Sequence, residues 1–300
     1  MRALDKAARA DTDPIKGWLG PCRRVRGCPH VEARRETVAA EVVTHGTVAV
    51  ARRGRWKAHW GTDPRDRLRR LLAEFIGTAG ITFVLGTGAA TFVLFAEVPG
   101  WAAGPLLAFA VALWVAAAVY FLGDISAHFN PAVTLAFAVG REIEWTIAAV
   151  YFVVQIVAAI FGSFLAWMFF GTAGNLARTD PQPGQDVQAM LFEIILTFGL
   201  VLLVLGMANG PKLNTRFIPL GAAAYIAAAA TIGGPYEGAS MNPARSIGPA
   251  VMTGHLENLW PYLAGPLLGG VLAVVVATVL RGSYRVAPLP SEAPTNIQGG

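Results

Sequence analysis

Six long runs of apolar residues are the feature that most constrains how this chain can fold. They lie near residues 68–95, 101–122, 144–171, 187–209, 215–233 and 258–281. Each run is apolar on nearly all faces of a helix, which is typical of a segment surrounded by lipid. At about 1.5 Å of rise per residue, each is also long enough to cross about 30 Å of hydrocarbon. The runs therefore predict an all-α membrane protein with six transmembrane helices.

The charged residues support this interpretation and mark off a tail. They make up 14% of the chain, against about 25% in a typical soluble domain. Residues 1–70 hold 17 of the 24 Lys and Arg residues but only eight of the 19 Asp and Glu residues. Because residues 1–66 are Arg-rich and weakly periodic, we expect a disordered, basic cytoplasmic tail there. We favour a solvated tail over one bound to anionic lipid or to nucleic acid.

Basic residues in the short connections predict the orientation of the chain. They stand before the first run, between the second and third, between the fourth and fifth, and after the sixth: Arg67, Arg69, Arg70, Arg141, Lys212, Arg216, Arg281 and Arg285. With six spans these places fall on one side, which the positive-inside rule makes cytoplasmic. Both termini are expected there, including a C-terminal tail at 284–300. The absence of a signal peptide favours a plasma membrane or the inner membrane of a bacterium.

Cysteine and histidine give no support for a metal site. Cys22, Cys28 and His30 cluster in the tail, and no second pair of ligands follows at the spacing of a zinc site. The apolar body holds no Ser-His-Asp set, metal-ligand cluster or phosphate-binding loop. We therefore expect no metal, no cofactor and no enzymatic activity.

Two further segments, 123–136 and 238–248, run from a loop into an apolar stretch too short to cross a membrane. Each contains the tripeptide Asn-Pro-Ala, and the six residues are Asn130, Pro131, Ala132, Asn242, Pro243 and Ala244. Asn is a strong N-cap, Pro is favoured at the first helical position, and Ala continues a helix. Each tripeptide therefore predicts the start of a re-entrant half-helix.

The chain also repeats itself. Ala-Glu-Phe-Ile around Glu74 opens the first run, and Phe-Glu-Ile-Ile around Glu193 opens the fourth. The sequence thus consists of two copies, about 68–171 and 187–281, each with three spans and one half-helix. Three is odd, so the copies enter the membrane from opposite sides, as in the inverted repeats of transport proteins.

In that arrangement the two half-helices meet N-terminus to N-terminus near the midplane. Each brings the positive end of a helix dipole and an Asn amide able to donate to a passing oxygen. Irregular backbone at this depth is tolerated where it lines a water-filled path. A plain helix cap explains one Asn-Pro-Ala but not two copies in matched repeats.

Segment 126–134, Ser-Ala-His-Phe-Asn-Pro-Ala-Val-Thr, and segment 242–246, Asn-Pro-Ala-Arg-Ser, resemble the two signature loops of aquaporins and glycerol facilitators, the major intrinsic protein family. The resemblance covers about 68–283 and implies a channel domain at 67–283. It implies passive flow of water or small uncharged solutes, exclusion of protons and ions, and a homotetramer with a pore in each subunit.

The resemblance also implies roles for individual residues. Asn130 and Asn242 would orient single-file water, and Arg245 would be the arginine of the outer constriction. Glu74 and Glu193 would accept hydrogen bonds from the re-entrant loops. His128 matches a loop histidine, for which gating and packing are both open.

The remaining filter positions follow from spacing within the family pattern. Ala230 lies twelve residues before Asn242, and Ala239 lies three before it. In the second span direct spacing gives Ala110, whereas a loop one residue shorter than usual gives Val111. Strict water channels of the family carry a bulky aromatic residue and a His at two of these places. The small residues here predict a wide filter that passes glycerol, urea or uncharged metalloid acids as well as water.

Other positions leave alternatives open. Ser246 and Ala250 match strict water channels, Tyr262 and Leu263 match neither subgroup, and the loops around Asn242 resemble the nodulin-like, solute-passing branch. The small residues could instead serve tight helix packing. A strict water channel is therefore the alternative, and a secondary transporter built on the same inverted repeat is a more distant one.

Overall fold

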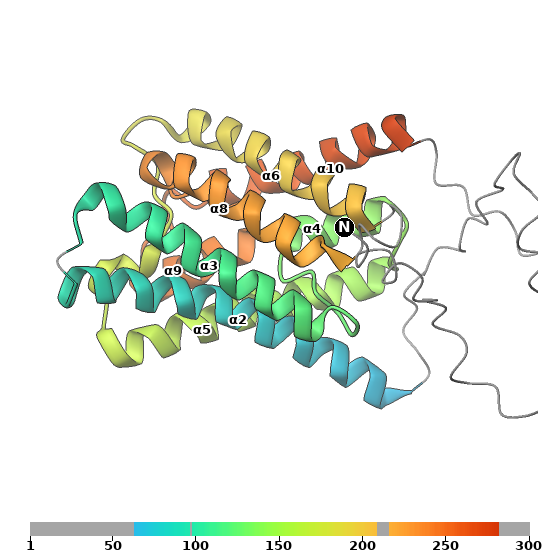
Figure 1. Ribbon diagram of the computed structural model, residues 1–300, viewed down its shortest axis with the longest axis horizontal. Coiled ribbons are helices and arrows are strands. Elements are labelled where there is room, and N and C mark those ends of the chain that lie inside the picture. The colour runs from blue at the N-terminus through green and yellow to red at the C-terminus, as the bar shows by residue number, and fades with distance from the viewer. Residues whose placement is uncertain (1–62, 97, 209–215, 282–300) are drawn as a thin grey trace, which may run out of the picture. The chain divides into compact units, whose positions relative to one another are not determined.

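The computed structural model describes residues 63–96, 98–208 and 216–281, whose regular structure is helical (Figure 1). The predicted N-terminal tail up to residue 62, the C-terminal tail and Lys212 lie outside these residues. Six of the helices are long and apolar enough to cross a membrane: α2 (Pro64–Leu94), α3 (Gly100–Leu122), α5 (Trp145–Phe170), α6 (Asp186–Ala208), α8 (Ile218–Glu237) and α10 (Pro261–Arg281). The prediction of six apolar spans is confirmed.

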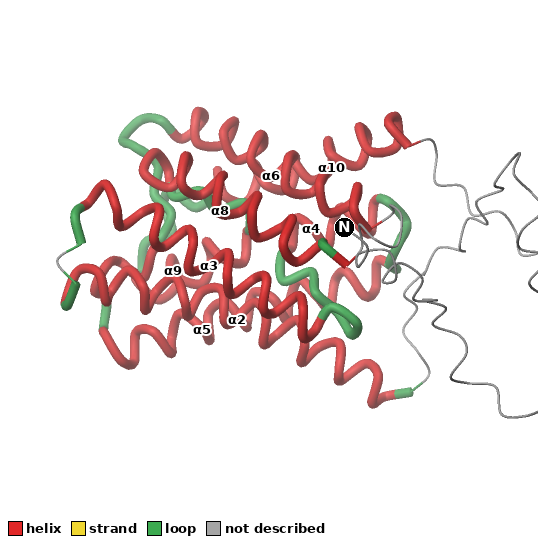
Figure 2. Tube along the Cα trace, viewed as in Figure 1, coloured by secondary structure: helices red, strands yellow, loops and turns green. Residues whose placement is uncertain are grey.

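Between the long helices lie shorter elements. α4 (Pro131–Val139) and α9 (Pro243–Thr253) begin at the two Asn-Pro-Ala tripeptides. A short 3₁₀ segment, η1 (Ala173–Ala177), lies in the connection between α5 and α6. Figure 2 shows the helices in red and the loops that join them in green. The predicted six helices plus two half-helices therefore match the architecture that the chain adopts.

Helix ends differ from the sequence prediction where capping and proline chemistry decide them. α2 begins at Pro64, because the Asp63 side chain accepts a hydrogen bond from the Arg65 amide at 2.9 Å and proline suits the first helical position. α8 continues through Gly-Gly-Pro to Glu237 and ends where Gly238 takes a left-handed φ of 101°. The apolar run at 215–233 predicted an end near residue 233, yet the helix accommodates Pro235 close to its terminus.

The helices pack in matched pairs. α2 packs most extensively on α5, and α6 on α10, so each pair joins the first and third long helices of one repeat. Glycine makes both contacts possible, because a Cβ at Gly162 would overlap the Ala79 carbonyl and one at Gly269 would overlap the Ile194 carbonyl. α3 packs on α8 across the repeats. The half-helices also cross over, since α9 packs on α5 and α4 on α10.

Residue size separates the inside of the helical unit from its outside. The most deeply buried residues include many alanines, such as Ala118, Ala158 and Ala159, whereas Phe109, Phe169 and Val279 are more than half exposed. Small residues between helices allow close backbone approach, and large apolar side chains on the outside suit a lipid solvent. The half-helices pack among the long helices of both repeats.

Candidate functional site

Both half-helices begin in the same way. The Asn130 Oδ1 accepts from the Ala132 amide at 2.8 Å, and the Asn242 Oδ1 accepts from the Ala244 amide at 3.0 Å and the Arg245 amide at 3.3 Å. Each Asn has an extended backbone and is followed by proline at the first helical position. The tripeptide thus forms a complete helix start with no donor left over at the proline.

The two starts are tied to each other. The Asn130 Nδ2 donates to the Met241 carbonyl at 2.7 Å, and the Asn242 Nδ2 donates to the Phe129 carbonyl at 2.8 Å. Phe129 and Met241 each take a left-handed φ of 52°, at the same place before each Asn. The half-helices therefore meet N-terminus to N-terminus. An Asn amide carries two N–H donors, so the second N–H of each remains for another acceptor.

A cavity of about 330 Å³ runs past this junction and is lined by Asn130, Asn242 and Arg245. Its remaining walls are largely aliphatic, with Val111 and Val115 from α3 and Ile226 from α8 among them. Polar groups thus come mainly from the two loops and their half-helices. A solute in the cavity would meet a polar strip and an apolar surround, an arrangement typical of small-molecule sites.

Arg245 lies on this cavity and is 7% exposed. Its Nη1 donates to the Ala177 carbonyl at 2.9 Å and its Nη2 to the Gly238 carbonyl at 3.1 Å. Ala177 belongs to η1, in which Asn175, Leu176 and Ala177 all have positive φ values near 50°. Because both acceptors are neutral carbonyls, they orient the guanidinium without cancelling its charge.

The other three filter candidates also reach the cavity. Val111, Ala230 and Ala239 line it, whereas Ala110 is not among the described lining residues. Val111 belongs to a buried cluster against which Ala177 packs, so it shares a cluster with the residue whose carbonyl binds Arg245. Of the two spacings considered for α3, the one that allows for a shorter loop gives the cavity residue.

Glu74 is fully buried and holds the loop before α4. Its Oε1 accepts from the Ser126 Oγ at 2.6 Å and the His128 amide at 2.8 Å. Its Oε2 accepts from the Phe129 amide and from the Gln155 Nε2, both at 2.8 Å. Four donors surround one carboxylate, which fixes the backbone immediately before Asn130.

Glu193 is also fully buried and holds the loop before α9. Its two oxygens accept from the backbone amides of Ser240 and Met241, the latter at 2.7 Å. Neither Glu74 nor Glu193 is among the described residues that line the cavity. Both carboxylates therefore contact the loops rather than a solute.

His128 both lines the cavity and packs within its loop. Its Nδ1 lies 3.1 Å from the Thr134 Oγ1. Its ring contacts Phe137 in a tilted arrangement and Tyr151 edge-on, at centroid distances of 4.7 and 5.6 Å. The Thr134 hydroxyl in turn accepts from the Gln155 Nε2 at 2.9 Å. The imidazole is thus held by neighbours on several sides.

Several polar contacts of the site were not predicted from the sequence. Gln155 supplies donors to both Glu74 and Thr134, and a lone amide in an otherwise apolar span is a signal that could have found it. Ser246 lies four residues after Asn242, as Thr134 does after Asn130. Its hydroxyl donates to the Ser240 Oγ at 2.6 Å and accepts from the Thr179 Oγ1 at 2.9 Å.

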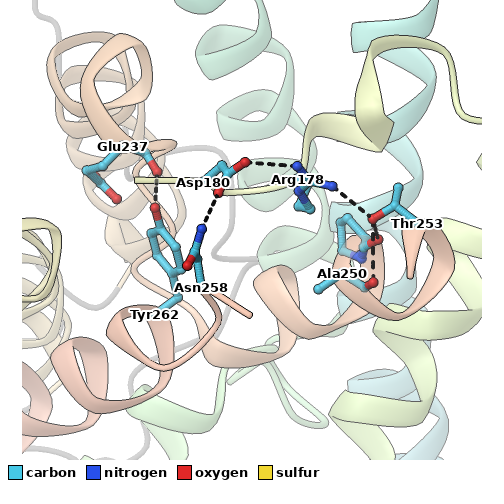
Figure 3. Close-up of polar contacts among 8 residues, drawn as sticks. Arg178, Asp180, Glu237, Ala250, Thr253, Asn258 and Tyr262 are labelled. Atoms are coloured by element: carbon cyan, nitrogen blue, oxygen red, sulfur yellow. Dashed lines mark hydrogen bonds and ion pairs between the residues drawn. The ribbon is translucent and has the colours of Figure 1, made fainter. Parts of the chain in front are cut away.

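Arg178 lines the cavity and is also joined to a group of polar side chains (Figure 3). The Arg178 Nη2 donates to the Asp180 Oδ2 at 2.8 Å and its Nη1 lies 3.5 Å from the Thr253 Oγ1. The Asn258 Nδ2 donates to the same carboxylate at 3.2 Å. These contacts join the connection that follows η1 to the end of α9 and to the segment before α10.

Comparison with known proteins agrees with this architecture. The family model described as major intrinsic protein matches residues 62–277. Nodulin-26 from Glycine max is 35% identical over 224 residues, covering 74% of this chain and 80% of that protein. Aquaporin NIP1-1 from Zea mays is 37% identical over 216 residues, covering 71% and 75%.

A solved structure shows the same fold. The aquaglyceroporin from Plasmodium falciparum superposes with a TM-score of 0.61 at 22% sequence identity, covering 71% of this chain and 96% of that chain. Together with six apolar spans and a cavity between two half-helices, these matches bear out the resemblance first noted in the loops. The chain therefore belongs to the major intrinsic protein family, and it is an integral membrane channel for water or small neutral solutes rather than an enzyme.

Proposed function

We propose that this channel passes small uncharged solutes such as glycerol, urea or metalloid acids together with water, and that it excludes protons and ions. The observation that carries the proposal is the character of the four filter residues. Arg245 is accompanied on the cavity wall by Val111, Ala230 and Ala239, which are all small and aliphatic. A filter of this kind leaves room for a solute larger than water.

The chemistry of the walls supports the same substrate class. A polyol has a carbon skeleton that packs against aliphatic walls, while its hydroxyls bond to the few polar groups on one side. Water makes only hydrogen bonds, so it gains less from apolar walls. Selectivity of such pores depends on their diameter and on the donors and acceptors that line them.

Exclusion of ions rests on positive potential at two levels. The N-termini of α4 and α9 meet at Asn130 and Asn242, where each helix dipole contributes about half a positive charge. Arg245 places its positively charged guanidinium on the cavity wall, whereas the acidic Glu193 is not among the described residues that line it. Cations and protons would be repelled at both levels, and a neutral solute would not.

Further proposals concern the residues that hold the loops, the oligomeric state and the membrane orientation. We assign Glu74 and Glu193 to holding the loops, and His128 to positioning the loop before α4. We also propose a homotetramer in a plasma membrane or a bacterial inner membrane, with both termini in the cytoplasm. The orientation is supported by Arg67, Arg69, Arg70, Arg141 and Arg216, which the repeat puts on one side.

Narrowing the filter tests the substrate class. In proteoliposomes the double variant Val111→Phe/Ala230→His is expected to lose most glycerol permeability while water permeability persists, because both side chains reach into the cavity. Leu113→Phe is the matched control. Leu113 is 54% exposed on α3, so this substitution adds the same aromatic ring to α3 on its outer face and not in the cavity. Equal glycerol flux in wild type and double variant would contradict the proposal, and saturable uptake coupled to an ion gradient would favour a secondary transporter.

A further inference from the structure

Glu237, the last residue of α8, is a buried acid with an unusual set of neighbours. It is 1% exposed, and its Oε1 accepts from the Ala239 amide at 2.9 Å. Its Oε2 is buried and meets no hydrogen-bond donor among the described residues. An ionised carboxylate oxygen left without a donor in a buried place is costly, so this oxygen calls for an explanation.

The explanation lies in a second carboxyl group. Glu237 accepts from the Ala239 amide, and Glu193 on α6 accepts from the next amide along the chain. The two carboxyl groups are therefore neighbours. Two carboxyl groups can share a hydrogen bond only if one of them carries a proton. Both oxygens of Glu193 already accept from the Ser240 and Met241 amides, as a carboxylate does. The proton therefore belongs on Glu237.

Counting charge gives the same answer. The charged and titratable groups that act on this pair are Arg245 on α9 and Tyr262 on α10, whose hydroxyl donates to the Glu237 carbonyl at 2.5 Å (Figure 3). With Tyr262 neutral and one proton on the pair, Arg245 and Glu193 balance each other. With both carboxylates ionised, the group would carry a net negative charge inside the membrane, which is expensive.

Comparison of the two repeats shows why such a donor is needed. Glu74 receives side-chain donors from Ser126 in its loop and from Gln155 on α5. Near Glu193, α10 presents Gly265, where a Cβ would lie 2.6 Å from the Glu193 Cβ. The residue four before Asn242 is Gly238, which has no side chain. A protonated Glu237 supplies the donor that neither of these glycines can.

We propose that Glu237 is a positioning residue of the filter that acts as a neutral acid, donating to Glu193 and accepting from Ala239. Both bonds act on segment 238–242. That segment contains the Gly238 carbonyl that binds the Arg245 Nη2 and the Ala239 methyl that lines the cavity. Glu237 thus acts on solute selection through its neighbours and does not touch the solute.

Glu237→Gln and Glu237→Ala separate the elements of this proposal. Glutamine keeps a neutral donor and an acceptor in nearly the same shape, whereas alanine removes both. Glu257→Gln is the control, because Glu257 is an exposed acid in the connection between α9 and α10. Infrared spectra of the full chain in liposomes at neutral pH read the carbonyl stretch of a protonated carboxyl group, and light scattering gives the ratio of glycerol to water permeability.

The wild type is expected to show the protonated-carboxyl band, Glu237→Gln to lose it, and Glu257→Gln to keep it. Glu237→Gln is expected to retain the wild-type permeability ratio, and Glu237→Ala to change it several-fold at equal amounts of inserted protein. Absence of the band in the wild type would overturn the proposal. So would a glutamine variant that behaves like the alanine variant, or an alanine variant with unchanged selectivity.

The proposal rests on the proposed function only for its transport readout. A wild-type protein that conducts no glycerol would contradict the assigned substrate class, while the infrared band would still decide whether Glu237 carries the proton. If Glu237→Ala does not fold, the glutamine variant and the spectrum keep the proposal testable.

Discussion

The two half-helices begin with the same three residues, yet the loops before them are held by different chemistry. Glu74 accepts four hydrogen bonds, all from neutral donors, and two of these donors are side chains. Glu193 accepts two backbone amides and lies beside a second acid and an arginine. The first loop is therefore fixed by a neutral polar network, and the second by a group of charges that must balance.

This difference follows from what each loop carries. The first loop ends in His128 and Phe129 and presents no formal charge to the cavity if the imidazole is neutral. The second loop precedes Arg245, whose charge has to be tolerated inside the membrane. Glu193 and Glu237 lie beside the second loop and share one proton. The pair therefore carries a single negative charge, which balances that of Arg245 without exceeding it. Duplicated segments can thus keep one backbone design while their supporting side chains diverge.

The largest expected effect comes from exchanging the two carboxylates for amides. Glu74→Gln places an NH₂ group against donors on one side of the side chain and should destabilise the fold by about 3 kcal/mol. In Glu193→Gln the new NH₂ also faces a backbone N–H, but the cost should be roughly half as large, because the NH₂ can donate to Glu237 as well. Thermal unfolding in detergent micelles compares the two variants. Equal losses of stability in the two variants would contradict the claim that the two loops are held by different chemistry.

Removing the helical donor to Glu74 should have the next largest effect. Gln155→Leu deprives both Glu74 and Thr134 of a donor and should cost about 2 kcal/mol of stability. The buried Oε1 of Gln155 has no partner among the described residues, so losing it limits the cost. Gln188→Leu is the control, since Gln188 is exposed near the start of α6. A stability as high as that of the control would mean that the neutral network contributes little.

A matched pair of hydroxyls sharpens the comparison at smaller magnitude. Thr134 and Ser246 occupy the same place in the two half-helices, and each hydroxyl has two side-chain partners. Thr134→Val and Ser246→Ala should each cost about 1 kcal/mol. Because Ser246 connects to Ser240 beside Glu193, only its variant should also alter the glycerol to water ratio. Altered selectivity in the Thr134 variant alone would reverse the assignment of the filter to the second loop.

The smallest effect is expected at the ion pair between Arg178 and Asp180. Asp180→Asn removes a partner of Arg178 that is itself exposed, and surface pairs of this kind contribute about 0.2–1 kcal/mol. Stability and glycerol flux should change little, and any change should shrink further in high salt. A large, salt-independent loss of flux would mean that the Arg178 group belongs to the filter.

The sequence allowed much of the fold and part of the site to be predicted. Six apolar runs and two Asn-Pro-Ala tripeptides were enough for the helices and half-helices, because length, apolarity and capping are local properties. Helix ends were less accurate, since the run predicted to end near residue 233 continues as a helix to Glu237. For the filter position on α3 the sequence left Ala110 and Val111 both open, and Val111 is the one that lines the cavity.

Residues that act through distant partners could not be predicted. Gln155 reaches Glu74 across 81 positions in the chain, and no local pattern links them. Glu237 was not singled out, because its burial and its nearness to Glu193 depend on how α6 and α8 pack. The charge balance around Arg245 became apparent only with these tertiary contacts.

The most direct test of the proposed wide filter is a pair of osmotic jumps on wild-type proteoliposomes followed by light scattering. After a jump of an impermeant osmolyte the vesicles should shrink fast. After an equal jump of glycerol they should shrink and then re-swell fast, and Asn242→Asp should alter both phases if flux runs through the pore. Fast shrinkage without re-swelling in glycerol would make this a strict water channel and would contradict the assignment of Val111, Ala230 and Ala239 to a solute-passing filter.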